Sequence, residues 1–129
     1  MVSYRTPLGR VRGMGAAKQG VGHFITQRTT GAALVILILW VIAVALGIGR
    51  ASFAVTSAWL GSPWNAVPAV LLIGVAFTHM NIGMQTIIED YIHVPATKIG
   101  LVILSLFVCW SGAALGIFSI LKVAFGGAH

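Results

Sequence analysis

The segment AVPAVLLIGVAFTHMNIGMQTII, residues 66–88, combines a long apolar run with a histidine, an asparagine and a glutamine. A helix needs about 20 apolar residues to cross a hydrocarbon core of roughly 30 Å, and this segment is long enough. Backbone groups left unpaired in lipid cost free energy, so a helical form is required there. The segment therefore predicts a transmembrane helix that carries polar side chains inside the membrane.

Two other segments share this length and apolar character. They are TGAALVILILWVIAVALGIG, residues 30–49, and IGLVILSLFVCWSGAALGIFSIL, residues 99–121. Together with residues 66–88 they predict an all-α membrane protein with three transmembrane helices. The loop of residues 52–65 has room for a short interfacial helix, where Trp59 and Trp64 suit an aromatic belt.

The composition is that of a membrane protein and not of a soluble domain. Of the 129 residues, 58% are hydrophobic and only 8% are charged. The single cysteine, Cys109, excludes an internal disulfide, and we interpret it as a small buried or lipid-facing residue. We expect a basic N-terminal segment, residues 1–28, followed by a transmembrane domain, residues 29–129.

Basic residues are distributed unevenly between the two sides of the predicted membrane. Five of the eight lie in the first 28 positions, and Lys98 lies in the loop on their side. Only Arg50 and Lys122 lie on the other side. Because cytoplasmic loops carry an excess of Lys and Arg, we expect a cytoplasmic N-terminus. The basic segment lacks an aromatic platform for bases, so we expect it at a phospholipid surface and not on nucleic acid.

His79 lies near the middle of the second span, where ionisable residues are costly and usually face protein. At 100° per residue it shares one helix face with Gly83, Thr86 and Asp90. Imidazole is a good axial ligand for haem iron, and Gly83 leaves room for a flat group one turn away. Three interpretations stay open: a haem ligand, a hydrogen bond to a neighbouring helix, and part of a proton or ion path.

A six-coordinate haem at His79 would need its second axial ligand from another chain. His23 and His93 lie at the inner interface, and His129 ends the chain. The nearby methionines are on the same helix as His79 and could not reach the opposite haem face. A haem at His79 therefore implies a second polypeptide, either a different subunit or another copy.

Where the second span reaches the inner surface, Glu89, Asp90 and Tyr91 follow one another. Adjacent helix positions point about 100° apart, so the two carboxylates cannot act as a paired acid and base on one atom. For Asp90 a salt bridge with Arg28 or Lys98 is one interpretation. Tyr91 suits an interfacial belt, and its phenol is also what a quinone carbonyl would need as a donor.

The stretch GHFITQR, residues 22–28, leads into the first span. His23 and Gln27 are four residues apart and share a face, with Arg28 beside them. A guanidinium suits bidentate recognition of haem propionates or lipid phosphates, and it equally suits a basic membrane anchor. His23 and Arg28 are therefore candidate residues at the inner interface.

The succession of RTPLGRVRGMGAAKQG, HFITQR and HMNIGMQTIIEDY resembles the small hydrophobic membrane-anchor subunit of succinate dehydrogenase. The most specific part of this resemblance is the spacing after His79. Gly83 follows it by four residues, and the pair Asp90-Tyr91 ends twelve residues after it. The resemblance implies a heteromeric helix bundle in the inner membrane, with a periplasmic C-terminus. Its partners would be a second membrane subunit, the cytochrome b556 chain, together with an iron–sulfur subunit and a flavoprotein.

The resemblance also implies roles for individual residues. His79 would be an axial ligand of a haem b shared with the second membrane subunit. Tyr91 would donate a hydrogen bond to ubiquinone, with Asp90 beside it in the quinone region. Arg28 would lie near the haem propionates and the quinone pocket, with His23 in the same region. Succinate oxidation would occur in another subunit, so this chain alone is not expected to be active.

Two other functions fit the residues. The first is a non-catalytic membrane adaptor or assembly protein, in which His79 only bonds a neighbouring helix. The second is the anchor of a quinol-oxidising fumarate reductase, because nothing in the chain sets the direction of electron flow. A reducible b-type haem in the assembled complex would argue against the adaptor.

Overall fold

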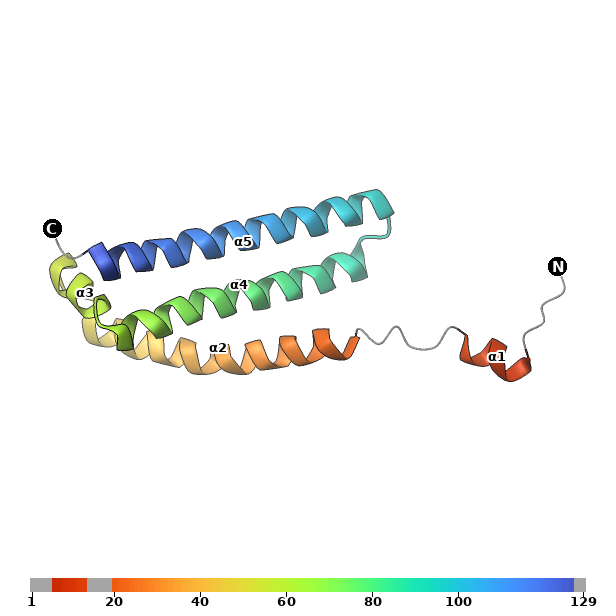
Figure 1. The fold of residues 1–129 in the computed structure, drawn as a ribbon, viewed down its shortest axis with the longest axis horizontal. Coiled ribbons are helices and arrows are strands. Elements are labelled where there is room, and N and C mark those ends of the chain that lie inside the picture. The colour runs from red at the N-terminus through yellow and green to blue at the C-terminus, as the bar shows by residue number, and fades with distance from the viewer. Residues whose placement is uncertain (1–5, 14–19, 127–129) are drawn as a thin grey trace.

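The computed structural model describes residues 6–13 and 20–126, which form five helices (Figure 1). In chain order these are α1 (Pro7–Arg12), α2 (Gly20–Ile48), α3 (Phe53–Leu60), α4 (Pro63–Tyr91) and α5 (Pro95–Gly126). The described residues contain no strand. Helices α2, α4 and α5 are long and apolar enough to cross a membrane, which confirms the predicted all-α architecture with three spans.

The long helices extend beyond the apolar spans predicted from the sequence. Helix α2 begins at Gly20, whereas its predicted span begins at residue 30, and α5 begins at Pro95 and not at residue 99. Helix α4 reaches Tyr91, so the carboxylates after residue 88 are helical and not part of a loop. Hydropathy marks only the part of a helix inside hydrocarbon, and the backbone continues its hydrogen bonds into the interface.

The connections from α2 to α5 are short and are marked by capping residues. Pro63 and Pro95 begin α4 and α5, where the missing proline N–H is not needed. Ser52 precedes α3, and its hydroxyl oxygen accepts from the backbone N–H of Val55 at 3.5 Å. Helix α3 confirms the short helix expected between the first two spans.

Trp59 of α3 contacts the first span directly. Its ring stacks on Trp40 of α2, with the ring centroids 6.0 Å apart. The sequence had suggested only an interfacial position for Trp59, because the partner lies 19 residues earlier (59 minus 40) on another helix. The stacked pair fixes α3 against the C-terminal half of α2.

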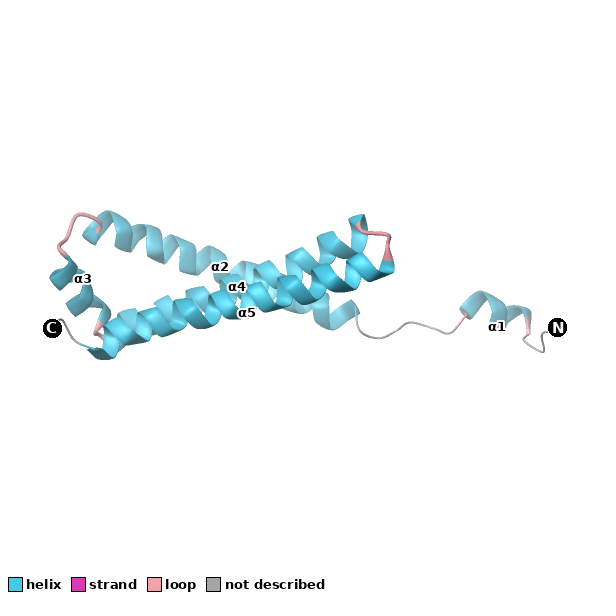
Figure 2. Cartoon of the chain, turned by 90° about the horizontal axis from the view of Figure 1, so that it is seen from above, coloured by secondary structure: helices cyan, strands magenta, loops and turns pink. Residues whose placement is uncertain are grey.

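Helix α4 is the central element of the bundle. It lies between α2 and α5 and packs against both, while α3 contacts α4 and α5 at one end (Figure 1). Seen from above, α2 crosses the α4–α5 pair obliquely (Figure 2). Few side chains are buried by this chain alone; the buried apolar ones are Ile82, Ile88, Cys109 and Ala113. The remaining apolar surface is suited to lipid or to other membrane chains.

Two glycines allow α5 to approach α4 closely. A Cβ at Gly112 would lie 2.5 Å from the ring of Phe77, and one at Gly116 would lie 2.9 Å from Ile73. Spaced four residues apart, the glycines lie on one helix face, as in the small-xxx-small pattern of membrane helix pairs. Cys109 is buried on the same face, in agreement with its interpretation as a small packing residue.

We predict that Gly112→Val separates α4 from α5 and destabilises the bundle by about 1–3 kcal/mol, the usual cost of overpacking. Cys109, which is the only cysteine of the chain, reports this separation. A thiol reagent should label it faster in the variant than in the parent protein in detergent. Gly100→Val is the matched control, since a Cβ at Gly100 meets nothing within 4 Å. Equal labelling rates in the two variants would contradict the prediction.

Candidate functional site

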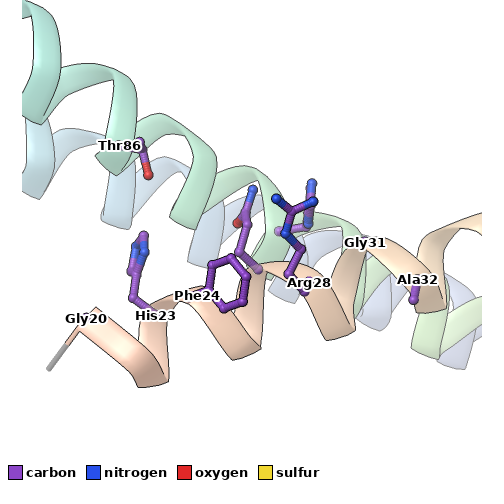
Figure 3. Close-up of a pocket in the computed structure, with 9 residues that line it drawn as sticks. Gly20, His23, Phe24, Arg28, Gly31, Ala32 and Thr86 are labelled. Atoms are coloured by element: carbon purple, nitrogen blue, oxygen red, sulfur yellow. The ribbon is translucent and has the colours of Figure 1, made fainter.

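A cavity of about 540 Å³ lies between α2 and α4 (Figure 3). Its volume is in the range of pockets that hold small molecules and cofactors. The cavity contains the mid-membrane histidine predicted from the sequence together with residues from the start of α2. Its lining residues are Gly20, His23, Phe24, Gln27, Arg28, Gly31, Ala32, His79 and Thr86.

His79 is held by a hydrogen bond across the α2–α4 contact. Its ring nitrogen Nδ1 lies 2.9 Å from the hydroxyl oxygen of Thr30. Thr30 Oγ1 also lies 2.7 Å from the backbone carbonyl oxygen of Thr26 and 3.2 Å from that of Gln27. This three-way contact joins the middle of α4 to the first half of α2.

The contacts of Thr30 assign the protonation of the His79 ring. A hydroxyl has one proton to donate, and a carbonyl oxygen can only accept, so the proton of Thr30 is directed to Thr26. Thr30 Oγ1 then accepts from His79, which places the ring hydrogen on Nδ1. In the neutral ring this arrangement leaves the lone pair on Nε2, the nitrogen that does not contact Thr30.

Glycine makes room beside the imidazole, and it does so from α2. A Cβ at Gly31 would lie 3.4 Å from His79 Cε1, so a larger side chain there would crowd the ring. Gly83, which the sequence placed on the His79 face, also faces α2: a Cβ there would lie 3.9 Å from Gln27 Nε2. Sequence reasoning did not identify Gly31, whose Cβ position is the one that lies beside the His79 ring.

Gln27 contributes a buried polar group to the cavity. Its side-chain oxygen Oε1 is buried and has no hydrogen-bond partner among the described residues. Buried polar groups are normally paired, and unpaired ones often mark a place where a ligand or water binds. Gln27 Oε1 is therefore an acceptor without a partner among the described residues, on a side chain that lines the cavity.

Basic and aromatic side chains of α2 line the cavity. Figure 3 shows His23, Phe24 and Arg28 projecting from α2 toward α4, which carries Thr86. The guanidinium carbon of Arg28 lies 5.3 Å from the centroid of the Phe24 ring, a cation–π distance. Stacking leaves the guanidinium N–H groups at its edge free to bind an anion.

The structure brings together three of the five site residues predicted from the sequence. His79, His23 and Arg28 line the same cavity, although His79 and Arg28 are 51 residues apart (79 minus 28). Thr86, which the helical spacing placed on the His79 face, lines it too. The predicted stripe on α4 is confirmed over this part of its length.

Tyr91 and Asp90 lie outside this cavity. Tyr91 is 76% exposed and lines an apolar groove of about 410 Å³ between α4 and α5, together with Met80, Met84 and Leu104. Asp90 is exposed at the end of α4. The twelve residues from His79 to Tyr91 turn the helix by about 120°, so the two side chains serve different faces of α4.

The polar groups around Asp90 make other contacts. Lys98 donates from Nζ to the backbone carbonyl of Glu89 at 2.9 Å, and the ring of His93 lies 3.2 Å from the carbonyl of Tyr91. Arg28 is on Phe24. Neither basic partner considered for Asp90 is thus directed at its carboxylate, which leaves the carboxylate open to the surface.

Comparison with known proteins shows the family of this chain. A sequence model of the succinate dehydrogenase/fumarate reductase transmembrane subunit matches residues 2–115. The chain belongs to this family. With its three apolar helices it is a multi-pass membrane protein.

Individual relatives of the family match nearly the whole chain. A protein of Rickettsia bellii is 28% identical over 120 residues, which cover 93% of this chain and 88% of the relative. One of Paracoccus denitrificans is 27% identical over 124 residues, 95% of each chain. One of Rickettsia conorii is 27% identical over 107 residues, covering 82% of this chain and 85% of the relative. All three are named succinate dehydrogenase hydrophobic membrane anchor subunit.

Sequence reasoning missed Thr30 and Gly31 as site residues and gave Gln27 no role. The spacing of His23, Gln27, Thr30 and Gly31 is i, i+4, i+7, i+8, which places all four on one side of α2. That pattern was available in the sequence. The sequence does not show that α2 pairs with α4. This pairing brings that side of α2 into contact with His79.

We predict that Thr30→Val removes the hydrogen-bond partner of His79, so that the ring hydrogen is no longer held on Nδ1. In the parent protein, nitrogen-15 shifts of the histidine side chains should show His79 protonated on Nδ1. The variant should show a mixture of tautomers. A bond of this kind between membrane helices contributes about 0.6 kcal/mol, so the chain should still insert.

Thr29→Val is the matched control for this measurement, because Thr29 is an exposed neighbour on α2. It should leave the His79 signals unchanged, and the His79→Gln variant assigns them by their loss. Identical spectra for Thr30→Val and the parent protein would show that Thr30 does not set the tautomer.

Proposed function

We propose that this chain is the hydrophobic membrane anchor subunit of a succinate dehydrogenase. The family membership, the relatives of that name and the three spans support this role. The chain would lie in the inner membrane with its N-terminus in the cytoplasm, where most of its Lys and Arg residues are. Its partners would be a second membrane subunit, an iron–sulfur subunit and the flavoprotein that oxidises succinate.

We further propose that the α2–α4 cavity is this chain's half of a haem b site. The observation that carries the proposal is the orientation of His79. Thr30 occupies Nδ1, so Nε2 keeps the lone pair that an axial ligand of iron needs. The hydrogen bond from Nδ1 also increases the basicity of the imidazole as a ligand.

The other lining residues suit the same group. Gly31 keeps the space beside the imidazole free of side chains, as a flat macrocycle requires. Arg28 and His23 line the same cavity from α2, where they would bind propionate carboxylates. Gln27 offers a buried amide that has no partner among the described residues. A second axial ligand would come from the other membrane subunit.

The bound haem would supply reversible one-electron chemistry, whereas this chain supplies position and polarity. Thr30 would keep His79 in one tautomer, α2 and α4 would cover part of the ring, and Arg28 lies where negative charge would be neutralised. The described residues contain no cluster of three or more metal-ligating side chains. The proposed site needs only one such side chain from this chain.

We propose Tyr91 and Asp90 as this chain's contribution to ubiquinone reduction. The Tyr91 phenol would donate a hydrogen bond to a quinone carbonyl oxygen and stabilise the negative charge that develops there during reduction. The quinone takes up two electrons, which come from the docked iron–sulfur subunit, and two protons from the inner side. Asp90 adjoins Tyr91 and is exposed, so it is placed to pass protons from the aqueous side.

A fumarate reductase anchor is the second candidate function, because the matching family model includes fumarate reductases. Direction of electron flow depends on the quinone and on the potentials in the partner subunits. Comparing succinate oxidation with fumarate reduction in the purified complex separates the two functions.

We predict that His79→Leu abolishes or strongly shifts the low-spin b-type spectrum of the purified complex, while all three spans still insert. Met80→Leu is the control: Met80 lies on the next position of α4, lines the groove of Tyr91 and faces away from Thr30. It should leave the spectrum intact. An unchanged spectrum in His79→Leu would place the ligand elsewhere.

Tyr91→Phe should lower quinone reduction about tenfold or more, because it removes one hydrogen bond made to a developing charge. Reduction of a soluble dye by the flavoprotein should be unaffected, and so should the haem spectrum. Equal loss of quinone and dye reduction would show a docking defect instead of a quinone-site defect.

A further inference from the structure

Two hydrogen-bonding side chains meet in a shallow hollow between α4 and α5, away from the His79 cavity. Asn81 and Trp110 line it together with Phe77, Thr78 and Cys109. Trp110 is the middle residue of the apolar span 99–121, and Asn81 lies well inside the span 66–88. Both side chains are therefore within the hydrocarbon layer.

Neither Asn81 nor Trp110 has a hydrogen-bond partner within residues 6–13 and 20–126, although their neighbours do. The hydroxyl of Thr78 donates to the carbonyl of Gly74 at 2.7 Å. The Asn81 amide offers two donor hydrogens and an acceptor oxygen, and the Trp110 indole offers one donor. Acyl chains provide no partner for any of these groups, so lipid contact would leave them unpaired at a cost in free energy.

The position of Trp110 is itself unusual. Tryptophan in membrane proteins is enriched at the two interfaces, where its ring is in lipid and its N–H in water. Trp110 is 67% exposed in this chain and lies at the centre of α5. An interfacial anchor role cannot explain an exposed indole at that depth, whereas contact with another protein can.

We propose that the surface formed by Thr78, Asn81 and Trp110 binds a transmembrane helix of a different polypeptide. That helix would present a hydrogen-bond acceptor to Trp110 and a polar side chain to Asn81. The surface is separate from the haem-facing side, because Asn81 follows His79 by two residues and points about 200° away. The inference rests on the proposed function only in expecting a heteromeric complex.

Charge at the inner end of α4 favours a different polypeptide over a second copy of this chain. Gln85 and Glu89 follow Asn81 at intervals of four residues, about 40° and 80° round the helix, and Gln85 Nε2 donates to Glu89 Oε1 at 2.8 Å. Two copies packed around an axis along the membrane normal would bring their Glu89 carboxylates to one depth, where they repel. A helix with Lys or Arg at the inner interface would complement Glu89.

The test is photocrosslinking in the purified, co-expressed complex. Trp110 is replaced by the photoreactive aromatic residue p-benzoylphenylalanine, and the adduct is mapped by mass spectrometry. Leu115 is the control position, because it is 68% exposed on the same helix and lies about 140° round it. We expect the Trp110 probe to join a transmembrane segment of another subunit at several times the yield obtained at Leu115.

Two outcomes would overturn the proposal: adducts of the Trp110 probe with lipid alone, or adducts with a second copy of this chain. The haem spectrum of the same preparation is read independently. A normal b-type spectrum with lipid adducts alone would reject the docking surface and keep the proposed function. Subunit adducts without haem would keep the docking surface and reject the haem site.

A substitution series tests the hydrogen bond directly. Asn81→Leu should weaken association of this chain with the other membrane subunit roughly threefold, the factor that about 0.6 kcal/mol corresponds to. Asn81→Gln should restore part of it, and Met80→Leu, a conservative change about 100° round the helix in a separate groove, should have no effect. Unchanged association in Asn81→Leu, measured by titrating detergent against the intact complex, would argue against the Asn81 contact.

Discussion

The hydrogen bond between His79 and Thr30 is the interaction on which the candidate site depends. Hydrocarbon offers a buried imidazole no partner, so the ring must be paired within protein. In this chain the only described contact that does so joins α4 to α2. This bond joins the two helices in one register, orients the ring and places a hydrogen on Nδ1. The cavity around it is the space left when α2 and α4 meet in that register.

The second constraint is close approach, which glycines on the outer helices provide. Gly31 of α2 lies against the His79 ring, and Gly112 of α5 lies against Phe77. In both contacts α4 carries a large side chain, and the neighbouring helix has a glycine opposite it. Helix α4 can therefore carry bulky functional groups on several faces and still pack closely on each side.

The sequence predicted the architecture well because membrane insertion is decided by local composition. Three spans, the short interfacial helix before residue 65 and the position of His79 all follow from hydropathy and helical period. Thr30 and Gly31 could not be assigned in this way, because their role arises from contact between segments about 50 residues apart in sequence (79 minus 30). Helical periodicity shows which residues share a face, but it does not show which other helix packs against that face. The helix ends were missed for a related reason: hydropathy ends at the lipid boundary, whereas backbone hydrogen bonding does not.

The proposed functional residues of α4 point in different directions around the helix and lie at different depths in the membrane. His79, Met80 and Asn81 are consecutive, yet they face α2, the Tyr91 groove and the Trp110 hollow respectively. Tyr91 lies about 18 Å further along the axis, at the rise of 1.5 Å per residue. A rigid helix with this spacing holds the proposed haem ligand and the proposed quinone donor at a fixed separation on different faces. Changes at one of them need not disturb the other, because no side chain of α4 lines both the His79 cavity and the Tyr91 groove.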